Sequence, residues 1–463
     1  MSKVYLYHSN DLHSHFDAWT RMSTFFSQVR EKHDERTDET FFFDIGDHMD
    51  RAHWLSDATE GKANVTLMNS VGYDAVTFGN NEGITLSKEG LDTLYKDAEF
   101  TVLAANLYDN DGNRPHWTRP YEIYTLKNGM RMAVIGLTVP FEKFYSQLGW
   151  KVTSPYEELD KLLSSIKLKA DVIILLSHLG IKDDEKIAEK YEEVDVIMGG
   201  HTHHLFENGK MMNQTLLAAA GKHGHYAGEI CLTFDDRKKV LIHKQAITHL
   251  IDEVDESLET KSLLDELEEG VDKRYNNQVV HLEQPLPVSW FSNSIITELL
   301  VSGLREWVGV DAAMMNAGVI LADLPAGPVT RKDIHHICPH PINPCKISLT
   351  GSELKAVIEK SFTKQMQELE FKGLGFRGKV MGAMVFDNIE IEWEILNDEE
   401  PILKQIRLNG VIVDHNKSYL IATLDMFTFG YLYPEMSHKT EKQYYMPEML
   451  RDVFAWKLKK EYG

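Results

Sequence analysis

Short apolar runs alternate with amphipathic stretches throughout the first half of the chain, and this alternation constrains the fold more than any other feature. The runs are rich in β-branched and aromatic residues and predict buried strands. Between them, apolar residues recur at helical spacing, for example Trp19, Met22 and Phe26. The pattern is typical of an α/β fold. Strands are expected at 4–8, 40–45, 75–78, 101–105, 132–138, 172–177, 194–198, 215–219 and 229–234.

A change in composition near the middle of the chain marks a boundary. Between positions 252 and 272 there are ten acidic residues and one lysine, Lys261, and leucines recur at helical spacing. We expect this segment to form a solvated helix that links two domains. The expected limits are 1–250 for the first domain, 251–275 for the linker helix and 276–463 for the second domain.

The second half predicts a separate α+β unit. Its first apolar segment, 292–307, has the spacing of a helix with one buried face, and a further helix is expected at 351–360. The strands expected around these helices are 312–315, 345–349, 389–395 and 418–423.

The formal net charge of -22 at pH 7 disfavours polyanionic partners, because it repels the phosphates of nucleic acids and anionic lipids. The N-terminus, MSKVYLYHSNDLHSHF, lacks the apolar core of a secretory signal, and no run of about 18 apolar residues predicts a membrane span. Cys231, Cys338 and Cys345 are too few for a disulfide framework. We therefore expect a cytoplasmic protein whose partner is a small molecule, with neither nucleic acid nor membrane bound.

Side chains that bind metals follow five of the expected strands. The carboxyl ends of strands in an α/β sheet open into a common crevice, so these side chains can meet there. In GGHTHH, two glycines let the backbone bend tightly, so that its two ligand histidines can face the same point. The predicted ligands are Asp11 and His13 in NDLH, Asp47 in GD, Asn80 in GNNE, His178 in SHLG, and His201 and His203 in GGHTH.

This donor set mixes oxygen and imidazole and contains no thiolate, which suits divalent Mn, Fe, Co, Ni or Zn. Three oxygen donors and four imidazoles are too many for one tetrahedral ion but suffice for two ions that share a carboxylate. Such a pair lies about 3.5–4 Å apart, lowers the pKa of a bridging water toward about 7 and clamps both oxygens of a phosphoryl displacement. The expected cofactor is therefore two divalent metal ions.

The order D-x-H, GD, GN-x-E, SH, GH-x-H resembles the signature of the calcineurin-like metallophosphoesterases over residues 3–235. The resemblance implies a four-layer αββα sandwich and a bridging role for Asp47. By the same resemblance, Asp11, His13, Asp47 and His203 surround one metal, and Asp47, Asn80, His178 and His201 surround the other.

The second half resembles the C-terminal domain of the 5'-nucleotidases. The resemblance is carried by MNAGVI, ADLPAGPVTRKDI, HPINP and LTGSELKAVIEKS. It implies that this α+β domain carries the substrate-specificity residues and that the substrates are nucleotide-like. Asn316 in MNAGVI and Asn343 in HPINP are the substrate contacts expected on these motifs.

One departure from the family lies beside the predicted metal site. The family carries His after the metal-binding Asn and Asp two residues beyond the Glu, whereas this chain has Asn81 and Ile84. A general acid raises the rate of the chemical step by about 10²–10⁴-fold. An amide cannot deliver a proton near pH 7. Three explanations would account for the missing His. The enzyme is slow, its substrate has a good leaving group such as a pyrophosphate, or another His takes its place. The expected catalytic residues are Asn81, His204 and His225, and His15, His48 and His223 are further histidines of these loops.

Other departures concern substrate recognition. The NxGGIR motif of the family ends in an Arg that holds the substrate phosphate, but Leu321 occupies that position here. Arg331 and Arg377 are expected to supply the missing donors. The family loop N-x-F-x-x-x-G-G-D-G appears as DMFTFGY, without its acidic residue. Phe427 in this loop and Phe376 in GFR are expected to stack on a base, with core packing as the alternative.

The sequence thus predicts metal-dependent hydrolysis of phosphate esters in nucleotide-like small molecules. Within enzymes, the alternatives are a cyclic phosphodiesterase and a nucleotide-sugar or dinucleotide pyrophosphatase. An alternative from another class is a regulatory protein that binds metal and nucleotide. It would account for Asn81, Ile84 and Leu321, which stand where the family carries His, Asp and Arg. The identity of the metal, the preferred base and the oligomeric state are open at this point.

Overall fold

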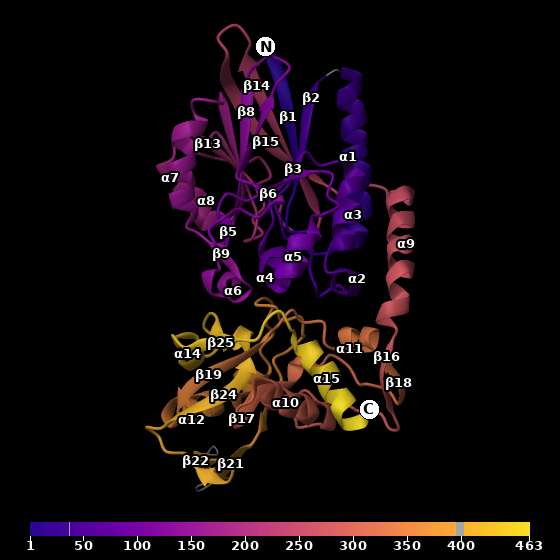
Figure 1. Cartoon of the computed structure of the whole chain (residues 1–463), viewed down its shortest axis with the longest axis vertical. Coiled ribbons are helices and arrows are strands. Elements are labelled where there is room, and N and C mark those ends of the chain that lie inside the picture. The colour runs from indigo at the N-terminus through magenta and orange to yellow at the C-terminus, as the bar shows by residue number, and fades with distance from the viewer. Residues whose placement is uncertain (37, 395–401) are drawn as a thin grey trace. The chain divides into compact units, whose positions relative to one another are not determined.

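The computed structural model describes residues 1–36, 38–394 and 402–463, with the side chains of 272–274 left out. The chain divides into two compact units, Met1–Val271 and Asp272–Gly463. Helix α9 (Leu258–Tyr275) carries the chain from the first unit into the second and occupies most of the acidic segment (Figure 1).

Two β-sheets form the centre of the first unit. All nine strands expected in this half are present, with small shifts at their ends. From edge to edge, the seven-stranded sheet is β15 (Val240–Leu250), β14 (Tyr226–Asp235), β1 (Ser2–Ser9), β2 (Glu39–Asp44), β3 (Ala75–Val76), β4 (Thr101–Leu103) and β6 (Thr118–Arg119). The six-stranded sheet is β12 (Lys210–Met212), β13 (Thr215–Ala218), β11 (Val196–Gly199), β10 (Val172–His178), β8 (Arg131–Thr138) and β7 (Tyr121–Thr125).

The two sheets pack against each other through a shared apolar core. Leu6 and Phe43 of the seven-stranded sheet lie in one buried cluster with Val134 and Ile174 of the six-stranded sheet. Burying each of these side chains stabilises the folded state by about 1.5–3 kcal/mol. This core joins the sheets face to face.

Helices cover the outer faces of both sheets. On one side, Phe26 of α1 (Phe16–Arg36) packs on Phe42 of β2, with ring centroids 5.5 Å apart. On the other side, Leu159 of α7 (Pro155–Ile166) and Ile187 of α8 (Ile181–Lys190) join the core beneath the six-stranded sheet. Figure 1 shows the resulting layers of helix, sheet, sheet and helix, which confirms the expected αββα architecture. The remaining helices are α2 (Trp54–Ala58), α3 (Lys62–Val71), α4 (Asn80–Thr85), α5 (Lys88–Leu94) and α6 (Glu142–Gln147).

The parallel strands of each sheet end at a common edge. Strands β1, β2 and β3 run parallel in one sheet, with Ser9 beside Asp44 and Asp44 beside Val76. Strands β8, β10 and β11 run parallel in the other, with Ser177 beside Gly199. The loops that follow these strands therefore emerge together, as expected for a site at the carboxyl edge of the sheets.

The second unit is built on a mixed five-stranded sheet. The helix expected at 292–307 begins later, at Ile295, because Ser294 caps it. The sheet order is β20 (Met384–Asp387), β17 (Ala312–Asn316), β24 (Ser418–Leu424), β19 (Pro344–Thr350) and β25 (Lys442–Tyr444). The main helices are α10 (Ile295–Val308), α11 (Arg331–Ile337), α12 (Gly351–Ser361) and α15 (Leu450–Tyr462).

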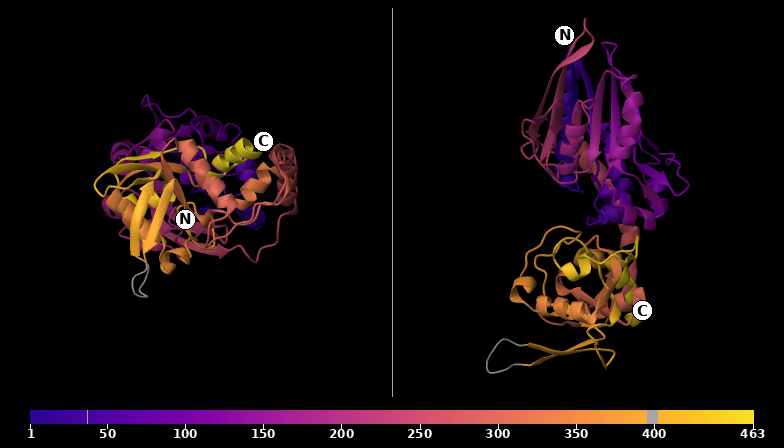
Figure 2. Two further views of the ribbon diagram at one scale, coloured as in Figure 1. Left: turned by 90° about the horizontal axis from the view of Figure 1, so that it is seen from below. Right: turned by 90° about the vertical axis from the view of Figure 1, so that its left-hand side faces the viewer.

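A second sheet of this unit, β21 (Ile389–Glu394), β22 (Ile402–Leu408) and β23 (Val411–Ile412), lies beside its main body (Figure 2). The strand expected at 389–395 corresponds to β21, and position 395 lies outside the described residues.

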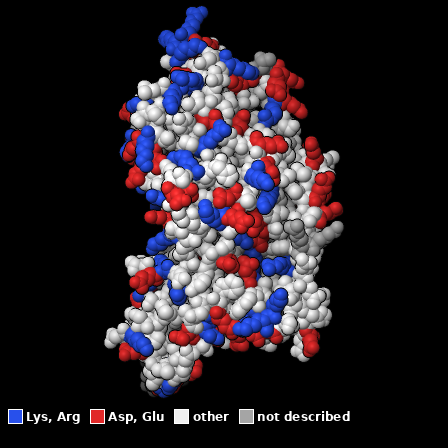
Figure 3. Space-filling model, in the orientation of Figure 1, with Lys and Arg blue, Asp and Glu red and all other residues white. Residues whose placement is uncertain are grey.

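Positively and negatively charged side chains are mixed on the face drawn in Figure 3, where Lys and Arg are interspersed with Asp and Glu. In the described part of the chain, no helix combines the length and the apolar character needed to cross a lipid bilayer.

Candidate metal centre

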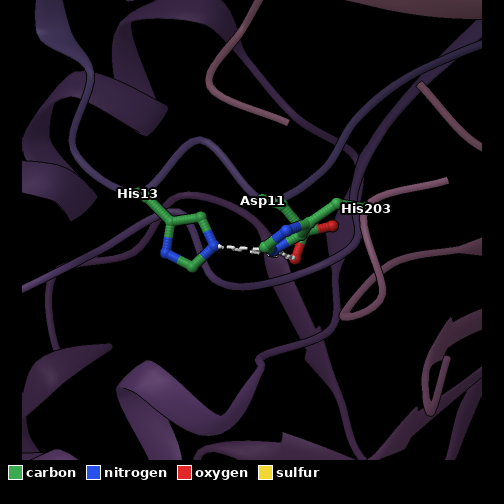
Figure 4. Close-up of side chains that lie close together, drawn as sticks. All are labelled: Asp11, His13 and His203. Atoms are coloured by element: carbon green, nitrogen blue, oxygen red, sulfur yellow. Dashed lines mark hydrogen bonds and ion pairs between the residues drawn. The ribbon is translucent and has the colours of Figure 1, made fainter. Parts of the chain in front are cut away.

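The first group of predicted ligands converges after β1 and β11. Nε2 of His13 lies 3.1 Å from Nε2 of His203 and 3.9 Å from Oδ1 of Asp11. Nε2 of His203 lies 3.5 Å from the same oxygen of Asp11. Figure 4 shows the three side chains facing a common point. Two imidazoles and a carboxylate at this spacing form a group that can hold one metal ion.

The second group contains Asp47, His178 and His201, whose ligand atoms also lie close enough to hold one ion. Oδ2 of Asp47 is 3.4 Å from Nε2 of His178. The same oxygen is only 3.8 Å from Nε2 of His13 in the first group. The Asp47 carboxylate therefore lies close to donors of both groups.

The backbone of the ligand loops adopts an unusual conformation. Five of the seven predicted ligands have positive φ, a region that costs a non-glycine residue about 1–3 kcal/mol and clusters at functional sites. The φ values are 51° for Asp11, 50° for His13, 52° for Asp47, 69° for His201 and 58° for His203.

Gly79 and Glu82 hold the loop that carries Asp47. A Cβ atom on Gly79 would lie 2.1 Å from Oδ1 of Asp47 and 2.5 Å from Nε2 of His178, so only glycine fits there. The Glu82 carboxylate accepts hydrogen bonds from the backbone N–H groups of Asp47, Met49 and Gly79. Glu82 was not among the predicted site residues, although the GNNE motif contains it.

Two unpaired buried atoms show that a cation fits this centre. Nδ1 of His178 hydrogen bonds the Ile45 carbonyl at 2.7 Å, so the hydrogen of the neutral ring lies on Nδ1 and the lone pair on Nε2. That Nε2 is buried without a hydrogen-bond partner, and so is Oδ1 of Asn80. An unpaired buried lone pair is costly, and a metal ion would satisfy both atoms. The residues present therefore fit a divalent metal.

Charges within the centre shift the pKa values of its members. Without a bound cation, burial opposes protonation of His178, but the charges of Asp47 and Asp11 outweigh burial and raise its pKa to about 10, so a metal ion would take the place of the proton on Nε2. Burial also favours the neutral form of Asp47, yet the neighbouring His178 outweighs it and holds the pKa well below its usual range. The carboxylates thus stay ionised at neutral pH and draw positive charge into the centre.

The other predicted catalytic histidines lie on the exposed surface. Nδ1 of His204 is 3.0 Å from Oγ1 of Thr202, and Nδ1 of His225 is 3.0 Å from Oδ1 of Asp252. Neither histidine belongs to the two ligand groups found in the described chain. A catalytic role for either remains a prediction.

Among the further loop histidines, His223 lies beside the first ligand group. Its ring centroid is 5.8 Å from that of His13, and it stacks on His15 at 3.8 Å. Its backbone N–H donates to the Asp11 carbonyl at 2.8 Å. His48, in contrast, is buried edge-on against Trp19, and burial lowers its pKa to about 3.

In the second unit, the polar residues expected to bind substrate have partners within the protein. Nδ2 of Asn316 donates to the Met381 carbonyl at 2.8 Å, while its buried Oδ1 has no hydrogen-bond partner. Nδ2 of Asn343 donates to the Glu448 carbonyl at 2.7 Å. Arg331, at the start of α11, has its guanidinium 3.7 Å from Asp452. The free oxygen of Asn316 is the feature here that most suggests a ligand.

The two phenylalanines expected to stack on a base are buried. Phe376 is 1% exposed and lies parallel to the His340 ring, with centroids 5.3 Å apart. Phe427 is fully buried and packs edge-on against Tyr433 at 5.2 Å. Arg377 is adjacent to Phe376, and its backbone N–H donates to Nδ1 of His340. These positions favour core packing over base stacking for both rings.

Asp425 is a buried carboxyl group that makes the stability of the second unit depend on pH. Burial raises its pKa from 3.8 to about 7. Between pH 3.8 and about pH 7, the carboxyl is therefore protonated in the folded state and ionised in the unfolded state. The associated stability is fully present below about pH 4 and is lost as pH rises toward 7, by at most about 1.4 kcal/mol per pH unit.

We expect Asp425→Asn to flatten this dependence, because the amide stays neutral throughout. Urea unfolding of both proteins at pH 5 and pH 8 measures the effect. The variant should gain stability relative to the wild type at pH 8 but much less at pH 5. An equal pH dependence in both proteins would show that Asp425 titrates normally.

Comparison with known proteins agrees with this geometry. Residues 5–205 match the family described as calcineurin-like phosphoesterase, and residues 279–431 match the family described as 5'-nucleotidase, C-terminal domain. The chain is 47% identical over 457 residues to the uncharacterized metallophosphoesterase YunD of Bacillus subtilis (strain 168), covering 98% of this chain and 99% of that protein. It is 25% identical over 431 residues to the 5'-nucleotidase of Rattus norvegicus, covering 80% and 73% of the two chains.

Solved structures share the fold over nearly the whole length. The NAD nucleotidase of Haemophilus influenzae superposes with a TM-score of 0.70 at 18% identity, covering 99% of this chain and 96% of that one. A putative 5'-nucleotidase from Staphylococcus aureus gives a TM-score of 0.70 at 17% identity, covering 100% and 97%. The chain belongs to the calcineurin-like metallophosphoesterases, hydrolases of phosphoester bonds, and carries the C-terminal domain of the 5'-nucleotidases.

Proposed function

We propose that this protein hydrolyses phosphate esters of nucleotide-like small molecules with two divalent metal ions. The observation that carries the proposal is the position of the Asp47 carboxylate, 3.4 Å from His178 and 3.8 Å from His13, between two groups of ligand atoms. A shared carboxylate is what a pair of ions requires, and a single-ion site would leave one group without a role.

The proposed ligand sets follow the two groups. When bound, two divalent ions would supply an activated water and would polarise the phosphoryl oxygens. The protein contributes by holding the donors in place before substrate arrives: the Ile45 carbonyl orients His178, and Glu82 fixes the loop of Asp47. Asp11, His13, Asp47 and His203 would hold one ion, and Asp47, Asn80, His178 and His201 the other.

A second candidate within the same chemistry is hydrolysis of a phosphoanhydride, as in nucleotide sugars or dinucleotides. The observation that favours it is Asn81, which has no proton to give at neutral pH. A phosphate leaving group departs without protonation, so an anhydride needs no general acid.

The nucleotide character of the substrate rests on the second unit. Its family and the relatives named 5'-nucleotidase support a base and a ribose as the recognised parts. The unpaired Oδ1 of Asn316 supports a hydrogen-bond donor of the substrate near the end of β17. The three free thiols, Cys231, Cys338 and Cys345, support action in the reducing cytoplasm.

The test is a phosphate-release screen with added Mn²⁺, before and after chelation. The substrates are nucleoside mono-, di- and triphosphates, nucleotide sugars, dinucleotides and cyclic nucleotides. We expect turnover of at least one class that chelation abolishes and Mn²⁺ restores. Tight nucleotide binding without turnover would instead identify a regulatory protein, and turnover that survives chelation would contradict the metal mechanism.

A further inference from the structure

Asn81 is only 9% exposed and contacts predicted ligands of both groups. Its Nδ2 lies 3.0 Å from the Met49 carbonyl and 2.8 Å from Nδ1 of His13. Its backbone N–H donates to Oδ1 of Asp47 at 2.8 Å. The residue that replaces the catalytic His of the family is therefore bonded to its protein neighbours.

The orientation of the Asn81 amide is determined by its neighbours. A backbone carbonyl only accepts hydrogen bonds, so the Nδ2 end of the amide must face Met49. The backbone N–H of Met49 donates in turn to Glu82, which holds that carbonyl in place. The Oδ1 end of Asn81 consequently points the other way, toward Asn80.

This orientation determines which end of Asn80 faces the ligands. Nδ2 of Asn80 donates to Oδ1 of Asn81 at 3.2 Å. The opposite end of the Asn80 amide, Oδ1, is then left buried and without a hydrogen-bond partner. A cation needs the oxygen and is repelled by the NH₂ group, so a reversed amide would destroy this ligand.

The contact with His13 plays a smaller part. If Nε2 of His13 faces a metal, its hydrogen lies on Nδ1, and Oδ2 of Asp50, 3.5 Å away, is the acceptor in reach. Nδ2 of Asn81 donates to that nitrogen only while the lone pair of His13 lies on Nδ1, so binding of a metal through Nε2 would break this 2.8 Å contact. Asn81 therefore affects the metal centre mainly through its hydrogen bond with Asn80.

We propose that Asn81 is a positioning residue that presents Oδ1 of Asn80 to the metal of the second ligand group. The proposal rests on the metal centre of the proposed function but not on the identity of the substrate. It assigns to Asn81 a role different from that of the family His, because one N–H of its amide is held by Met49 and the other faces His13. Neither is directed at a leaving group.

The test is a titration of the metal-free protein with Mn²⁺, which measures the affinity of each ion separately. Asn80→Ala removes the ligand oxygen and identifies the affected ion. Asn81→Ala should weaken the same ion by about 10–100-fold, the usual effect of losing a residue that orients a ligand, and change the other by less than about threefold. The double variant Asn80→Ala/Asn81→Ala should be no weaker than Asn80→Ala alone, because both act through one oxygen.

A matched control is Asn69→Ala, which removes an amide of the same first unit that bonds Asp97 and Glu99. It should bind both ions as the wild type does. Unchanged affinities in Asn81→Ala, equal weakening of both ions, or additive losses in the double variant would each overturn the proposal.

Activity gives an independent check on the best substrate of the phosphate-release screen. Asn81→Ala should regain most of the wild-type kcat at saturating Mn²⁺, because the missing contact only holds a ligand. A loss that persists at saturation would make Asn81 a catalytic group and contradict the proposal. If the wild type binds Mn²⁺ with the expected dependence on Asn81 yet releases no phosphate, the proposed function fails and the positioning role stands.

Discussion

Asp47→Asn is expected to lower kcat/KM on the best phosphate ester by at least about 10³-fold. The wild-type carboxylate lies 3.4 Å from His178 and 3.8 Å from His13, so it is placed to serve both of the proposed ions. The amide keeps the shape but removes the charge and one of the two metal-binding oxygens. Metal ions supply several kcal/mol to phosphoryl transfer, and each 1.4 kcal/mol corresponds to about tenfold in rate.

The control for this variant is Asp97→Asn, which changes an exposed carboxyl of the same unit and should leave the rate unchanged. Both variants are assayed after metal analysis and with added Mn²⁺. Wild-type turnover in Asp47→Asn with a folded C-terminal unit would contradict the bridging role.

Phe427→Ala is expected to lower the free energy of unfolding of the second unit by about 3–5 kcal/mol. The ring is fully buried in the turn after β24 and packs on Tyr433, so its removal leaves a cavity. Urea unfolding followed by circular dichroism measures the change. Because no part of the ring reaches the surface, KM for a nucleotide substrate should change little while the variant stays folded.

The matched control is Phe291→Ala, since that ring is 53% exposed in the same unit and should cost much less. A raised KM in Phe427→Ala without loss of stability would show that the ring leaves the core to stack on a base.

The positions of the metal ligands could be predicted because local patterns carry them. Asp11, Asp47 and His178 each follow or end a buried strand, and parallel strands deliver such residues to one edge of a sheet. The apolar runs that form those strands are visible over a few residues, and so the αββα layers could be predicted as well.

Other features depend on contacts between distant segments. Glu82 bonds three backbone groups, two of them more than 30 residues earlier in the chain, and no local pattern predicts that. Strand β15 was also missed, since its alternation is weak and its place at a sheet edge comes from pairing with β14.

The aromatic residues show a related limit. Phe376 and Phe427 lie in loop-like motifs, where exposure and burial are equally compatible with the sequence, and only the packing of His340 and Tyr433 distinguishes them. For His204 and His225 the sequence gives the loop but not the direction of the side chain, which here meets Thr202 and Asp252.

The most direct test of the central claim is the electron paramagnetic resonance spectrum of the protein loaded with Mn²⁺. Two ions bridged by Asp47 would lie about 3.5–4 Å apart and couple magnetically. We expect a spin-coupled spectrum at two equivalents of Mn²⁺, replaced in Asp47→Asn by the six-line signal of isolated ions. A wild-type spectrum of isolated ions alone at every loading would contradict the two-metal centre.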